Sequence, residues 1–114
     1  MEIKIISDKI GLEELKNLAP ADFGEMIKAA VDIEKGIMAI GGEWHSDAER
    51  VLLEAGSEQK NLWGINLFPG RAGEAMIEFT SLINIRPKLN NRTMIIEIPE
   101  VKEKIYQIVN KLIS

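Results

Sequence analysis

The sequence contains no cysteine, and this absence excludes several kinds of functional site at once. A chain without cysteine has no disulfide framework, no thiolate zinc site, no iron–sulfur cluster and no cysteine nucleophile. Histidine is almost as scarce, because His45 is the only one. Catalytic zinc sites usually take three protein ligands, and most of these sites are rich in histidine. We therefore expect no cofactor.

Aromatic residues and positive charge are also in short supply. Phe, Trp and Tyr make up 5% of the chain, and 14 basic residues against 18 acidic ones give a net charge of −4. Nucleic-acid binding is therefore not expected. No apolar run reaches the roughly 18 to 20 residues that cross a bilayer, and the first residues lack the layout of a secretory signal. We expect a cytoplasmic protein that makes no membrane contact.

The chain does contain enough apolar material for one core. Its 114 residues are close to the commonest domain size, and 46% of them are hydrophobic. No linker, repeat or low-complexity tract divides the chain, so we expect one domain over residues 1–114. Strand-like runs and amphipathic helical segments are both present. This mixture predicts an α+β fold, with a mostly antiparallel sheet and helices packed mainly on one face.

In the first forty residues, strand patterns surround one short helix. An edge strand is predicted over residues 2–6, and leucines at helical spacing predict a helix over residues 12–18. Helical and strand patterns overlap over residues 23–31, where we favour a helix that passes into a strand. The apolar runs 29–33 and 37–40 flank a short connection that contains glycine, and such a pattern predicts a hairpin.

The second half of the chain begins with a helix signal. Residues 46–49 have the spacing of a capping box, in which serine and glutamate side chains satisfy backbone donors at a helix start. The helix is predicted to end at Gly56, where a left-handed residue is favoured. The later elements are a strand over 62–68, an antiparallel strand over 76–86, a short strand over 93–98 and a helix from Pro99.

The single histidine stands in a polar stretch that forms the first candidate site. On an extended backbone Glu43, His45 and Asp47 would point to the same side, and these side chains can bind a divalent metal. Asp47 is equally explained by the first turn of a helix, where negative charge is favourable. We predict no metal site and name these three residues as the candidates if one exists. His45 and Glu43 are the candidate catalytic residues.

A second candidate site comes from the alternation of the predicted strands. Asn66, Asn84 and Arg86 fall on the face opposite the predicted core, and Asn91 and Arg92 follow on a loop. An arginine fork with amide donors suits a carboxylate or phosphate, so a small anionic ligand is one interpretation. The other is structural, because the outer face of such a sheet must be polar and its polar residues often hold loops in place.

Four motifs give the chain a family resemblance over nearly its whole length. They are Val31-Asp32-Ile33-Glu34-Lys35-Gly36-Ile37-Met38, Gly42-Glu43-Trp44-His45 with Asp47-Ala48-Glu49, Leu62-Trp63-Gly64-Ile65-Asn66, and Ser81-Leu82-Ile83-Asn84-Ile85-Arg86-Pro87 with Asn91-Arg92. On these residues the chain resembles a small uncharacterised prokaryotic family, known as a domain of unknown function. The resemblance implies that the candidate residues Glu43, His45, Asn66, Asn84, Arg86, Asn91 and Arg92 belong to the family pattern. It implies no activity.

The chain departs from this family pattern at three positions. Trp44 stands where leucine is expected, Met94 where arginine is expected, and Ile98 where an aspartate would cap the last helix. The missing arginine weakens the argument for a basic anion site. The missing cap should cost about 1 kcal/mol of local helix stability.

Two functions of different classes follow from these patterns. The first is a non-catalytic binding or accessory domain that self-associates, because the isoleucine-rich run 95–98 offers an apolar surface for a partner. The alternative is a small hydrolase or a phosphate- or nucleotide-directed enzyme. In that enzyme His45 would act as general base or metal ligand with Glu43 as its orienter, while Arg86 and Arg92 hold an anion.

Overall fold

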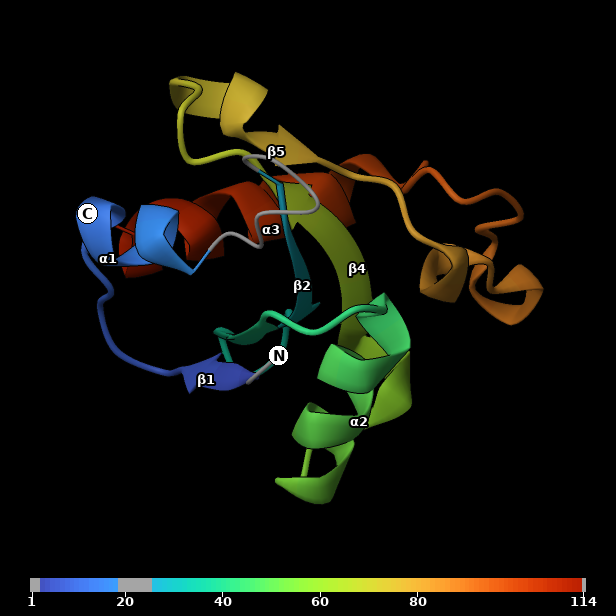
Figure 1. The fold of residues 1–114 in the computed structure, drawn as a ribbon. Helices are drawn as coiled ribbons and strands as arrows, with labels where there is room; N and C mark the ends of the chain where they lie inside the picture. The colour runs from blue at the N-terminus through green and yellow to red at the C-terminus, as the bar shows by residue number, and fades with distance from the viewer. Residues whose placement is uncertain (1–2, 19–25, 114) are drawn as a thin grey trace.

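The computed structural model describes residues 3–18 and 26–113, which form an antiparallel sheet with helices on both faces (Figure 1). The strands are β1 (Lys4–Ile6), β2 (Ile27–Asp32), β3 (Ile37–Ile40), β4 (Leu62–Leu67) and β5 (Ile77–Glu78), in the order β1-β3-β2-β4-β5. The helices are α1 (Leu12–Asn17), α2 (His45–Glu54) and α3 (Pro99–Leu112). The described residues also contain four 3-10 turns: η2 (Gln59–Asn61), η3 (Gly73–Met76), η4 (Leu82–Asn84) and η5 (Pro87–Leu89). The α+β prediction is confirmed.

The predicted hairpin is β2 and β3, and a buried carboxylate holds its turn. Oδ1 of Asp32 accepts hydrogen bonds from the backbone N–H groups of Glu34 and Lys35, both at 2.9 Å. Oδ2 of the same residue accepts from the hydroxyl of Ser57 at 2.6 Å. Gly36 closes the turn with a φ of +69°, a conformation that glycine adopts at no steric cost. One oxygen of the buried Asp32 carboxylate therefore holds the turn, and the other connects it to Ser57.

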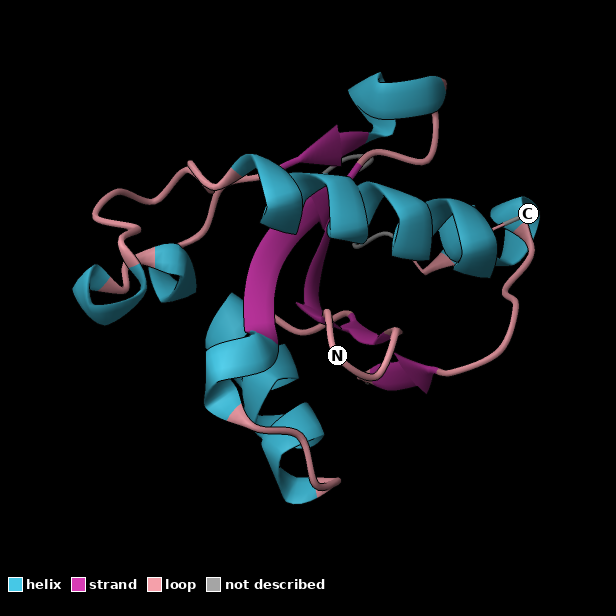
Figure 2. Ribbon diagram, turned by 180° about the vertical axis from the view of Figure 1, so that it is seen from behind, coloured by secondary structure: helices cyan, strands magenta, loops and turns pink. Residues whose placement is uncertain are grey.

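The larger core lies between the sheet and the two helices α1 and α3. Alternate side chains of each strand point to this face, because successive residues of a strand point to opposite sides. Figure 2 shows α3 crossing the strands from one end of the sheet to the other. Its stripe of Val101, Ile105, Val109 and Leu112 is buried there, as the helical spacing predicts. Leu15 of α1 adds to the same cluster.

Helix α2 packs on the opposite face of the sheet, over a smaller core. That core contains Ala30, Ala39 and Leu62 from the strands, together with Ala48 and Leu52 from the helix. The small alanine side chains leave room for the helix to lie close to β2 and β3. Two of the three α helices thus share one face of the sheet, and the third occupies the other.

The predicted capping box at the start of α2 is wrong. The helix begins two residues earlier than the box predicts, at His45, with Trp44 as its N-cap in place of Ser46 and no capping hydrogen bond from a side chain. Glu49 does not reach back to the helix start, because its carboxylate pairs with Arg86. The end of the helix is as predicted, since Gly56 has a φ of +107°.

The long strand predicted over 76–86 and the short strand over 93–98 are also wrong. Strand β5 covers only Ile77–Glu78, and the chain then turns at Ser81, whose hydroxyl accepts a hydrogen bond from the N–H of Ile83. The turn breaks the period-two alternation, so Asn84 becomes buried and Ile85 exposed. Residues 93–98 contribute a single bridge, between Thr80 and Ile95. Side-chain hydrogen bonds described below take the place of the missing ladders.

The remaining predictions concern the helices. The helix expected at the start of residues 23–31 falls mainly on residues 23–25, which lie outside the described residues, and β2 follows from Ile27. Helix α3 starts after Ile98 without a side-chain cap, as the missing aspartate predicts. Among the described residues, no helix is both long enough and apolar enough to span a membrane.

Gly64 in β4 gives the first testable prediction. A Cβ atom at this position would lie 2.5 Å from Cβ of Ser81 and 2.9 Å from Cγ1 of Ile83, closer than atoms can approach. We expect Gly64→Ala to lower the free energy of unfolding by about 1 to 3 kcal/mol, the usual cost of overpacking. Chemical denaturation would measure this.

The matched control is Gly11→Ala, because no atom lies within 4 Å of the added Cβ at Gly11. Gly11 precedes α1 at the N-cap position, where alanine is less favourable than glycine by about 0.5 kcal/mol. Equal losses in the two variants would contradict a steric requirement for Gly64.

Candidate functional site

Residues 79–96 form an arm of two limbs beside β4, on the side of the sheet away from β1 (Figure 1). Strand β5 pairs only with Asn66 and Leu67, so the rest of this edge of β4 is left to the arm. Backbone hydrogen bonds join the two limbs at three levels: Ile96 to Phe79 at the base, Ser81 to Met94 in the middle, and Arg86 with Asn91 at the tip. Four of the eight candidate site residues lie in this arm.

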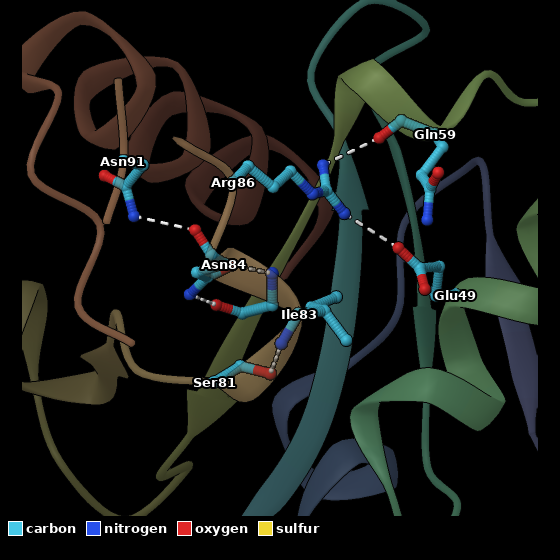
Figure 3. Close-up of polar contacts among 8 residues, drawn as sticks. Glu49, Gln59, Ser81, Ile83, Asn84, Arg86 and Asn91 are labelled. Carbon is cyan, nitrogen blue, oxygen red and sulfur yellow. Dashed lines mark hydrogen bonds and ion pairs between the residues drawn. The ribbon is translucent and has the colours of Figure 1, made fainter. Parts of the chain in front are cut away.

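Asn84 fastens the arm to the sheet. Its Oδ1 accepts a hydrogen bond from the N–H of Gly64 at 2.7 Å, and its Nδ2 donates to the carbonyl of Gly64 at 2.9 Å (Figure 3). The side-chain amide therefore pairs with β4 as the backbone of a neighbouring strand would. Its Nδ2 also donates to the carbonyl of Met94 at 3.1 Å, which links both limbs to β4. Asn84 is fully buried and satisfied within the fold.

Asn91 performs a similar task inside the arm. Its Nδ2 lies within hydrogen-bond distance of three backbone carbonyls, those of Asn84, Thr93 and Ile95. Its Oδ1 accepts from the N–H of Glu97 at 2.7 Å. The side chain is fully buried between the limbs, so it holds the arm together from within.

Arg86 connects the arm to the rest of the protein through a largely buried ion pair. Its Nη2 lies 2.8 Å from Oε2 of Glu49 in α2, and its Nη1 donates to the carbonyl of Gln59 at 2.7 Å (Figure 3). The two charged side chains are only 13% and 12% exposed. Burial lowers the pKa of Arg86, and the neighbouring Glu49 opposes that shift. The guanidinium fork is thus occupied and its charge balanced.

Arg92 lies apart from this ion pair. Its backbone N–H donates to the Glu97 carboxylate, and the residue is exposed on the return limb. The structure therefore joins Asn84 and Arg86 to one network, but Arg92 contributes no side-chain hydrogen bond or ion pair to it within the described part of the chain.

His45 belongs to a second polar network, at the start of α2. Its Nε2 lies 2.9 Å from the carbonyl of Ile65 and 2.8 Å from Oδ1 of Asn66. Both partners only accept hydrogen bonds, so Nε2 carries the proton and Nδ1 keeps its lone pair when the ring is neutral. The amide of Asn66 is oriented in turn by Glu78, whose Oε1 accepts from Nδ2 at 2.8 Å. Imidazole, amide and carboxylate thus form a continuous chain.

Neither of the two carboxylates expected beside His45 contacts its ring among the described residues. Asp47 lies in the helix and pairs with Arg50 at 3.1 Å, so it does not share a side of an extended backbone with His45. Glu43 is exposed, and its carbonyl accepts from Nζ of Lys28. Within residues 3–18 and 26–113, no three His, Cys, Asp or Glu side chains are placed to hold a metal ion.

Three residues that were not selected from the sequence contact the candidate residues: Lys28 contacts Glu43, Glu49 contacts Arg86, and Glu78 contacts Asn66. Glu49 carries a signal in the sequence, because it lies four residues after His45 and so shares a helix face with it. Glu78 also had a signal, since it lies on the predicted polar face with Asn84 and Arg86. Lys28 was hidden by the ambiguous pattern before the hairpin.

The environment of His45 predicts a pH dependence. Burial lowers its pKa below the ordinary value of 6.5 and Lys28 adds to this, whereas the hydrogen bonds to Ile65 and Asn66 and the charge of Glu78 act in the opposite direction. The unfolded chain therefore takes up a proton more readily than the folded one, and folding stability falls as the pH drops below about 6.5. We expect urea denaturation between about pH 7 and pH 5 to show a steeper loss in the native chain than in His45→Gln. Parallel curves for the two proteins would contradict this.

Asn84 gives a second prediction for the site. Asn84→Ala removes one side chain and leaves the N–H and the carbonyl of Gly64 without partners, whereas the carbonyl of Met94 keeps its hydrogen bond from the N–H of Ser81. We expect a loss of about 3 kcal/mol in the free energy of unfolding, since each buried polar group left unpaired costs about 1 to 3 kcal/mol. Hydrogen exchange should show faster exchange throughout residues 79–96.

The control for this variant is Asn110→Ala, on the exposed side of α3. It removes the same side chain from a position where water replaces any lost contact, and we expect a change within about 0.5 kcal/mol. If Asn84→Ala leaves the exchange of the arm unchanged, the side-chain amide does not hold the arm.

Comparison with known proteins identifies the family of this chain. A search of curated proteins and a search of solved structures each produced no match. The family described as a protein of unknown function (DUF5674) matches residues 4–112, which include both polar networks and the whole arm. The chain therefore belongs to the DUF5674 family of proteins of unknown function.

Proposed function

We propose that this protein is a non-catalytic binding domain and that the arm is the surface with which it binds another protein. The observation that carries the proposal is the exposure of large apolar side chains on the arm. Seven such side chains are exposed among the described residues, and four of them lie in the arm: Leu82, Ile85, Met94 and Ile95. Leu82 is 67% exposed and Ile95 is 56% exposed. Exposed apolar side chains gathered on one short segment favour a protein partner.

The charge of the arm supports the same proposal. Residues 79–96 include three basic side chains, Arg86, Lys88 and Arg92, and no carboxylate. The whole chain carries a net charge of −4, so the rest of the protein carries −7. Since Glu49 balances Arg86, the cations that the arm presents to a partner are Lys88 and Arg92. A partner surface with apolar and acidic side chains would complement this arrangement.

Hydrogen bonds hold the arm in an ordered conformation, and this order favours a role in binding. Asn84 ties the arm to β4 and Asn91 ties the two limbs to each other, so the exposed apolar side chains are held on a fixed frame. A surface that is already ordered loses less conformational entropy when it binds. The buried asparagines of the sequence motifs therefore have a role in binding without touching a ligand.

A groove beside the arm extends this surface. It has a volume of about 530 Å³ and lies between the arm, α2 and η2. Leu82, Ile85 and Leu89 supply apolar lining on the arm side, and the ion pair of Arg86 with Glu49 lies at its inner wall. A side chain of the partner can enter here next to the exposed leucine.

The enzymatic alternative requires Arg86 and Arg92 to hold an anion beside His45. An anion at Arg86 would compete with Glu49, which lies 2.8 Å away in a largely buried pair. The chain of His45, Asn66 and Glu78 orients the imidazole, but its Nε2 is already committed to two acceptors. These contacts hold elements of the domain together, so their presence does not require an enzymatic function. They therefore favour the binding function.

Photo-crosslinking tests the proposed binding surface. A photoreactive residue at position 82, introduced in cells of the source organism, should give a specific crosslink to a protein chain. The purified partner should then bind the native chain, and Ile95→Asp should weaken that binding by about tenfold or more, because it places a charge in an apolar contact.

Position 53 provides the control, since Leu53 is an exposed leucine on α2, outside the arm. Equal crosslinking from positions 82 and 53, or equal effects of Ile95→Asp and Leu53→Asp on binding, would contradict the arm as the binding surface.

A further inference from the structure

We infer that the partner of the arm is a second copy of this chain, docked so that the tip of each arm lies in an acidic groove at the base of the other. This inference rests on the proposed function of the arm as a binding surface. The receiving groove has a volume of about 310 Å³ and lies between η3, the base of the arm and the start of α3. It is a different groove from the one beside α2 described above.

The chemistry of the receiving groove is suited to a basic side chain. Three carboxylates line it, those of Glu74, Glu97 and Glu103, and the rings of Phe79 and Tyr106 form its apolar part. Nζ of Lys102 lies 5.3 Å from the centre of the Phe79 ring, so the groove already holds one cation over an aromatic face. Three carboxylates against one ammonium leave an excess of negative charge.

The arm supplies the complementary charges. Lys88 lies in η5 at the tip of the arm and Arg92 on the adjoining part of the return limb, and both are exposed. Neither side chain forms an ion pair within the described residues. A lysine or arginine that enters the groove of another copy would gain carboxylate partners and, with Phe79 and Tyr106, aromatic contact.

The order of these features along the arm fits a twofold interface. The base carries the acidic groove, the limbs carry the exposed Leu82, Ile85, Met94 and Ile95, and the tip carries Lys88. Arg92 lies on the return limb, where its backbone N–H meets the Glu97 carboxylate and its side chain is exposed. In a twofold interface the same surface is used by both copies, so it must be complementary to itself. Two arms lying antiparallel would place each positive tip at a negative base and bring the apolar side chains of the limbs together.

Other occupants fit these observations less well. A nucleic acid or an anionic membrane would be attracted to Lys88 and Arg92 but repelled by the carboxylates at the base and by the −7 charge of the rest of the chain. An unrelated acidic protein would satisfy the tip and the limbs of the arm but would leave the acidic groove unused. A second copy uses all three parts.

Charge-reversal variants of the full chain, compared in sedimentation experiments, test this inference. The native chain should form dimers whose dissociation constant rises with salt. Lys88→Glu with Arg92→Glu reverses the tip, and Glu74→Lys with Glu103→Lys reverses the groove. Each double variant alone should dimerise about tenfold or more weakly than the native chain, because like charges then meet. An equimolar mixture of the two should form a heterodimer of nearly native affinity, since both tip-to-groove contacts are again of opposite charge.

The control is Lys104→Glu with Lys111→Glu, which makes the same change of charge on the side of α3 that faces the β2–β3 turn. It should leave dimerisation unchanged, and circular dichroism should show that all the variants are folded. The substituted side chains are all exposed, and Lys88→Glu alone serves if a double variant is unstable.

Three outcomes would overturn the inference: a native chain that stays monomeric at high concentration, variants that dimerise as the control does, or a mixture that fails to restore binding. These outcomes are distinguishable from failure of the proposed function. If Leu82→Asp abolishes dimers that the charge reversals leave intact, the arm is the binding surface but the acidic groove is not its receptor. If the native chain is monomeric while position 82 crosslinks to another protein, the arm binds a different partner.

Discussion

The hydrogen bonds between the side-chain amide of Asn84 and the backbone of Gly64 are the contact on which the arm depends. β4 has no strand partner along much of this edge, and an unpaired edge exposes donors and acceptors that either need water or attract another chain. The amide meets the N–H and the carbonyl of Gly64 together, at 2.7 and 2.9 Å. Gly64 makes this possible because it has no Cβ to collide with Ser81. One side chain therefore completes the sheet and positions eighteen residues of arm.

The polar residues of the motifs mostly work inside the fold. Asn66 connects His45 with Glu78, Asn91 joins the two limbs of the arm, and Arg86 links the arm to α2 and η2. Each of these groups is buried or half-buried, where leaving it unpaired would be costly. The outward-facing chemistry of the arm is instead apolar and basic.

The two faces of the sheet carry different kinds of contact. The face under α1 and α3 is an apolar core built from branched and aromatic side chains. The face under α2 combines a small core with both polar networks, since His45 and Glu49 come from the same side of that helix. Helix α2 is therefore linked to β5 through His45, Asn66 and Glu78, and it is linked to the arm through the ion pair of Glu49 with Arg86. Charge is also divided, with a basic arm on an otherwise acidic domain.

The sequence alone determined the fold class, the β2–β3 hairpin, β4, the course of α3 and the glycine that ends α2. These features depend on local periodicity and turn chemistry, which neighbouring residues decide. It also singled out the asparagines and Arg86, but not what they bind. Only the tertiary structure decided that Asn84 replaces a strand, that Glu49 pairs with Arg86 instead of capping its helix, and that Leu82 and Ile95 stay exposed. The partners in those contacts are 20 and 37 residues apart in the chain, and no local pattern encodes such a distance.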